Sequence, residues 1–101
     1  LYQGKTGEGP SKSAAANWFA KAAKGGDAEG QFLYAYALAT GEGVARDPIQ
    51  AYVWVLRSSA HGASGAPEYD QDRIKLKTGL EKILRPDEVA KAAIEAQKPL
   101  S

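Results

Sequence analysis

The sequence predicts an all-α protein: an α/α solenoid of antiparallel helix pairs that ends in a C-terminal capping helix pair. Three observations support this fold class. Alanine, the best helix former, recurs in clusters, and no stretch alternates apolar and polar residues as a half-buried strand would. Helix-starting and helix-ending residues follow one another at short intervals. These signals also recur at an offset of 36 residues, the separation of Trp18 from Trp54.

The clearest helix start is the pair Asp47 and Pro48. The Asp47 carboxylate can accept hydrogen bonds from the free N–H groups of a first helical turn, and Gln50 stands where a capping-box partner belongs. Proline suits the first helical position because its missing N–H has no partner to lose there. We expect this helix to end at Gly62, which supplies a left-handed residue.

Glycines also mark a turn in the preceding segment. Gly41 and Gly43 bracket a turn that leaves a helix starting near Asp27. In all, at least five helices are expected, near 12–24, 27–40, 48–61, 67–84 and 86–98. We interpret 1–101 as a single repeat domain, with 1–26 a partial first repeat, 27–62 a second repeat and 63–101 the C-terminal capping helices.

The 36-residue offset aligns turns, caps and large side chains. Because Trp18 and Trp54 occupy matching positions, we expect both to pack as core residues between helices. The other aligned pairs are Gly7 with Gly43, Ser11 with Asp47, Ala15 with Ala51, Lys21 with Arg57, and Gly26 with Gly62.

Two stretches, AANWFAKAAKGGDAEGQ at 15–31 and GEGVARDPIQAYVWVLRSSAHG at 41–62, resemble Sel-one-like repeats, relatives of tetratricopeptide repeats with a longer, glycine-containing turn. The tail LRPDEVAKAAIEAQ is similar to the closing helix of many bacterial members. The resemblance implies a solenoid used for protein–protein contact and no chemistry. The matching positions are Ala15, Trp18, Ala22, Ala23, Gly26 and Asp27, then Gln31, Gly41, Gly43, Val44, Asp47, Ala51, Trp54 and Gly62.

The second unit departs from the family pattern at four positions. Ala35 stands where a glycine is usual, Leu38 where a tyrosine is usual, and Ser58 and Ser59 replace an Ala-Ala pair. The resemblance also implies the core positions of the helix at 28–40. These are Gln31, Tyr34, Ala35 and Leu38.

The C-terminal third is expected to cover the end of the array, since a solenoid exposes apolar surface unless a terminal unit caps it. In the helix at 67–84, the side chains expected to face the array are Ile74, Leu80, Ile83 and Leu84. Pro86 should start the last helix, with Asp87 and Glu88 at its positive end. No comparable cap precedes Leu1, so we expect the chain to come from a longer protein.

No residue pattern indicates a reaction, so we expect no catalytic residue, no metal, no cofactor and no enzyme activity. His61 is the lone histidine, next to a helix-ending glycine, and no cysteine is present. Ser58 and Ser59 present no nucleophile motif. The stretch GKTGEG at 4–9 lacks the spacer of a phosphate loop. A hydrolase activity, proposed for some similar repeat proteins, would lack a catalytic constellation here.

The net charge and the hydropathy of the sequence argue against two classes of binding partner. A net charge of +1 argues against nucleic acid, and no apolar run approaches the roughly 20 residues that insert into a membrane. The sequence leaves the oligomeric state and the compartment open, with the bacterial periplasm or secretion preferred for the latter. A basic run is interleaved with acids and is interpreted as a solvated helix face. It comprises Arg73, Lys75, Lys77, Lys82 and Arg85.

The helix at 28–40 carries more large apolar side chains than its core positions require. Glu29, Phe32, Leu33 and Tyr36 share the face roughly opposite those core positions. In similar solenoids the first helix of each unit lines the concave face. We therefore predict that these four residues line a groove for a protein or peptide partner of a non-enzymatic scaffold, although burial between neighbouring units also explains them. The alternative function is a structural or regulatory repeat module of a larger enzyme or envelope assembly, without a groove of its own.

Overall fold

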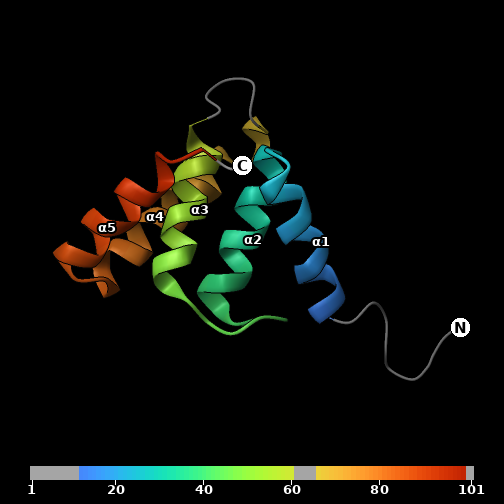
Figure 1. Ribbon diagram of the computed structural model, residues 1–101, viewed down its shortest axis with the longest axis horizontal. Coiled ribbons are helices and arrows are strands. Elements are labelled where there is room, and N and C mark those ends of the chain that lie inside the picture. Colours follow the sequence, from blue (N-terminus) through green and yellow to red (C-terminus); the bar gives the residue numbers. More distant parts are fainter. Residues whose placement is uncertain (1–11, 61–65, 100–101) are drawn as a thin grey trace, which may run out of the picture.

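The computed structural model describes residues 12–60 and 66–99, and all regular structure in these residues is helical (Figure 1). The all-α fold class is therefore confirmed. The helices are α1 (Lys12–Lys24), α2 (Ala28–Thr40), α3 (Pro48–Ser59), a 3₁₀ helix (Pro67–Tyr69), α4 (Asp70–Ile83) and α5 (Pro86–Ala96).

Packed helix pairs build the array, with α3 at its centre. α1 packs on α2, α2 packs on α3, and both α4 and α5 pack on the other side of α3. Figure 1 shows α1 and α5 at opposite ends of this arrangement. The two C-terminal helices thus cover α3, as expected of a capping pair.

Aspartate side chains cap both α2 and α3, and the cap at Asp47 is the one that the sequence predicted. Asp47 Oδ1 accepts a hydrogen bond from the Gln50 N–H at 3.1 Å, and Asp27 Oδ2 accepts one from the Gly30 N–H at 2.7 Å. At the other end of α2, Gly41 adopts the left-handed conformation with φ 79°. The expected cap at Ser11 and the stop at Gly62 lie outside the described residues.

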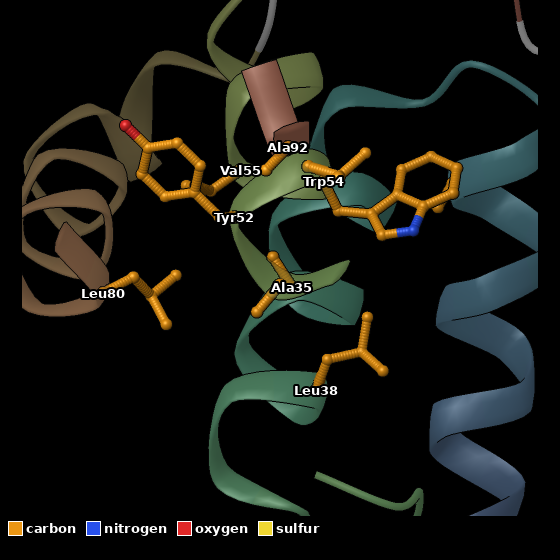
Figure 2. Close-up of a cluster of buried hydrophobic side chains, with 10 residues drawn as sticks. Ala35, Leu38, Tyr52, Trp54, Val55, Leu80 and Ala92 are labelled. Atoms are coloured by element: carbon orange, nitrogen blue, oxygen red, sulfur yellow. The ribbon is translucent and has the colours of Figure 1, made fainter. Parts of the chain in front are cut away.

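The core combines alanines with a few large side chains, and residues of all five α-helices contribute to it (Figure 2). Helices α1 and α2 approach each other closely at Gly30, because a Cβ at this position would lie 2.4 Å from the Ala22 Cβ. The side chains labelled in the figure are Ala35 and Leu38 from α2, Tyr52, Trp54 and Val55 from α3, Leu80 from α4 and Ala92 from α5.

The two tryptophans do not share an environment, so the prediction that both are core residues was wrong for Trp18. Trp54 is 6% exposed, whereas Trp18 is 72% exposed. Trp54 packs edge-on against Tyr34 of the preceding helix α2, with ring centroids 5.7 Å apart.

The buried face of α4 also differs from the expected one. Leu80 is buried and Leu84 is partly buried, but Ile74 and Ile83 are 57% and 55% exposed. Arg73 is 4% exposed, and it lies seven residues, or two helical turns, before Leu80 on the same face. The interpretation of the basic run as a solvated face was therefore wrong for this arginine.

Hydrogen bonds explain why Arg73 is buried. Its Nη1 donates to Ser58 Oγ at 3.1 Å, and its Nη2 donates to the Ala66 carbonyl at 3.0 Å and pairs with Asp70. Ser58 Oγ in turn donates to the Ala28 carbonyl at 2.7 Å. A buried cation is tolerated when its donors are satisfied in this way, and the chain of bonds ties α4 to α3 and to the start of α2.

Candidate functional site

Helix α2 has one face in the core, a contact with α1, and a third face that carries the predicted site residues. The core residues expected from the family pattern are placed as predicted: Gln31, Ala35 and Leu38 are buried, and Tyr34 packs partly buried against the core. Gln31 Nε2 donates to the Ala23 carbonyl at 3.1 Å, which ties α2 to α1. The remaining face carries the predicted site residues.

A groove of about 550 Å³ runs between α2 and α4. We call this the α2–α4 groove. Three of the four predicted site residues line its α2 wall: Phe32, which is buried, Leu33, which is half-buried, and Tyr36, which is 48% exposed. The opposite wall comes from α4 and consists of Asp72, Lys75 and Leu76.

Glu29, the fourth predicted site residue, does not line the groove. Its carboxylate accepts a hydrogen bond of 2.9 Å from the hydroxyl of Tyr69 in the 3₁₀ helix. The Tyr69 ring lies against Phe32, with centroids 5.0 Å apart. The pKa of Tyr69 is raised, and the largest cause is this hydrogen bond to the Glu29 carboxylate. Glu29 therefore positions the aromatic pair that supports the α2 wall.

The same α2 side chains reach a smaller depression on the other side. Leu33 and Tyr36 also line a cavity of about 90 Å³ toward α1, where Ala15 and Phe19 contribute apolar surface. The rim of this depression includes Lys12 and Glu42. Leu33 and Tyr36 thus form a ridge between two hollows, so apolar surface continues from α1 across α2 to α4.

A third cavity, of about 280 Å³, lies near the ends of α3 and α5 and includes Arg57 in its lining. Arg57 Nη2 donates to the carbonyls of Glu95 and Lys98 at 2.9 and 3.4 Å, and its guanidinium lies 4.7 Å from the Trp54 ring centroid. These contacts hold α5 on α3, so we interpret this arginine as a packing residue.

One cluster of titratable side chains joins α3 to α4. The Tyr52 hydroxyl and the Lys77 ammonium both donate to Glu81 Oε2, the latter at 2.7 Å. Burial, followed by the contact with Glu81, raises the pKa of Tyr52, and the hydrogen bond from Lys77 lowers the pKa of Glu81. None of the three lines the α2–α4 groove.

Among residues 12–60 and 66–99, no three histidine, aspartate or glutamate side chains gather so as to hold a metal ion. Ser58 is buried with its hydroxyl bonded to a backbone carbonyl, and Ser59 Oγ donates to the Val55 carbonyl at 2.9 Å. His61 and the stretch at 4–9 lie outside the described residues. Within residues 12–60 and 66–99, no helix is long and apolar enough to cross a membrane.

Sequence reasoning found the α2 wall and missed the α4 wall. The α4 wall, made of Asp72, Lys75 and Leu76, is far from α2 in the sequence. Only the packing of both helices on α3 brings it opposite Phe32 and Tyr36. The excess of apolar residues on α2 was a readable signal. No comparable signal marked α4, where two charged residues share the wall with one leucine.

Comparison with protein families gave one finding. The family model of the Sel1 repeat matches residues 1–27 and 28–62. The search of curated proteins and the search of solved structures found no match.

Proposed function

Because the chain belongs to the Sel1 repeat family, whose repeats are generally protein-interaction modules, we propose that it is a non-enzymatic scaffold that binds a partner protein in the α2–α4 groove. Members of this family are typically non-enzymatic. The division into units at 1–26, 27–62 and 63–101 is part of the proposal.

The observation that carries the proposal is the aromatic surface of α2 beside a hollow. Tyr36 leaves nearly half of its surface exposed next to the half-buried Leu33, although α2 already fills its core positions with other side chains. Contiguous apolar surface on a protein is commonly a binding site, and rigid aromatic rings give contact area with little loss of conformational entropy.

Within this proposal the four predicted site residues have different roles. Leu33 and Tyr36 contact the partner. Phe32 forms the floor beneath them, and Glu29 holds Tyr69 against Phe32. Lys75 and Asp72 add charge at the opposite wall, where they can select among partners by their own charges.

Site-specific photo-crosslinking tests the proposal. A photoreactive phenylalanine analogue replaces Tyr36 in one variant and Ile74 in another, because Ile74 is an exposed apolar residue of α4 that does not line the groove. We expect one protein to be crosslinked from position 36 and not from position 74. That protein is then purified and its affinity for the chain measured by calorimetry.

The affinity measurement uses matched variants. Replacing Leu33 and Tyr36 together by serine should weaken binding at least about tenfold, the effect of losing roughly 1.4 kcal/mol, whereas Ile74→Ser should leave it unchanged. Circular dichroism verifies that each variant keeps its helices. Equal crosslinking from both positions, or equal affinities, would refute the groove and favour a structural repeat module with no groove of its own.

A further inference from the structure

The walls of the α2–α4 groove offer mainly side chains. Five of the six lining residues lie in the interior of α2 or α4, where their backbone N–H and C=O groups are engaged within the helices, and Asp72 lies in the first turn of α4. A strand added to a sheet edge obtains its affinity from main-chain hydrogen bonds. An extended peptide in this groove would bury a row of backbone polar groups, and the walls offer only the polar ends of Tyr36, Asp72 and Lys75 to pair them, which is unfavourable.

The lining side chains on both walls have helical spacing. Phe32 and Tyr36 are one turn apart on α2, and Asp72 and Leu76 are one turn apart on α4. Such rows of side chains four residues apart are the ridges that pack into the grooves of another helix. A helical occupant also pairs its own backbone groups, so it can enter an apolar groove without that penalty.

We propose that the occupant of the α2–α4 groove is an amphipathic α-helix of the partner protein, an inference that rests on the proposed function. Its apolar stripe lies along Phe32, Leu33 and Leu76, with spacing of three and four residues. The ring of Tyr36 covers one side of that stripe.

Charge is placed on one wall only. The α2 lining carries no charged side chain, whereas the α4 lining carries Asp72 and Lys75, three residues apart on one side of the helix. The partner helix therefore carries its complementary charges on the side that faces α4. A basic residue opposite Asp72 and an acidic residue opposite Lys75 fix the direction in which the helix lies.

Two display libraries of equal length test this inference. One randomises the exposed face of a fixed helical scaffold, and the other is a linear random peptide library. Both are selected on the full chain. We expect binders from the helical library whose affinity falls at least tenfold with Tyr36→Ser and severalfold with Lys75→Glu. Lys82→Glu makes the same charge change at an exposed position of α4 outside the groove, and should have no effect.

The outcomes separate the two proposals. Binders that come from the linear library, depend on Tyr36 and stay extended when bound, as shown by the chemical shifts of the labelled peptide, would overturn the helical occupant and leave the groove as a binding site. Helical binders that are insensitive to Lys75→Glu would overturn the assignment of direction by charge. If neither library yields a binder sensitive to Tyr36→Ser, the groove itself fails as the partner site.

Discussion

Replacing Trp54 and Trp18 separately by alanine tests the packing of the array with one and the same substitution. Trp54 is 6% exposed and contacts Tyr34 and Arg57, whereas Trp18 is 72% exposed. A buried tryptophan removes about 200 Å² from water, which at about 25 cal/mol per Å² contributes about 5 kcal/mol. Alanine keeps part of this contribution, so Trp54→Ala should lower the free energy of unfolding by about 3–5 kcal/mol.

Trp18→Ala should change the free energy of unfolding by less than about 0.5 kcal/mol, as expected for an exposed position. Urea unfolding followed by circular dichroism measures both, because this signal does not depend on the tryptophan that is removed. Domains of this size have total stabilities of about 5–15 kcal/mol, so the Trp54 variant should unfold at a much lower urea concentration. Equal losses for the two variants would show that Trp18 is packed in solution and would refute this reasoning.

Three further predictions concern a cap, two glycines and one carboxylate. Asp47→Ala removes the bond to the Gln50 N–H and should cost about 1 kcal/mol in urea unfolding. Gly43→Ala should cost about 2 kcal/mol or more, since φ is 79° and the new Cβ would meet the backbone of Lys12, whereas Gly79→Ala, in open space within α4, should stabilise by about 0.8 kcal/mol. The pKa of Glu81 is lowered in the folded state, so its contribution is present at neutral pH and is lost as the pH falls below the ordinary glutamate range. Glu81→Gln should therefore show a smaller loss of stability on acidification, and an unchanged acid profile would contradict this.

Local backbone chemistry made the helices predictable. Asp47 and Asp27 cap because a short side-chain carboxylate reaches the first turn, and Gly41 ends α2 because glycine adopts positive φ without strain. These effects need only a few neighbouring residues. The starts and ends of α2 and α3 could accordingly be assigned from the sequence within one or two residues.

Side-chain burial was less predictable because it depends on distant neighbours. The repeat offset matches Trp18 to Trp54, but it carries no information about which helix covers each ring. On α4, apolar residues occur on more than one side, and the buried face is fixed by contact with α3. Ser58 replaces a family alanine and accepts a bond from Arg73, so this departure from the pattern was the one sequence signal for a buried arginine.

Only one wall of the α2–α4 groove could be predicted from the sequence. Its α2 wall follows from an excess of aromatic residues along thirteen consecutive positions. The α4 wall depends on the angle at which two helices rest on α3, which no local pattern encodes. Whether Leu33 and Tyr36 contact a partner stays a prediction until the crosslinking experiment is done.

The unequal surroundings of the two tryptophans give the chain two optical reporters. Indole emission shifts to longer wavelength in water, so Trp18 dominates the red side of the spectrum and the buried Trp54 the blue side. Lys21 lies 5.8 Å from the Trp18 ring and attracts iodide, a quencher that cannot reach Trp54. Loss of iodide quenching at constant blue emission therefore reports that the outer surface of α1 has been covered while the core stays intact.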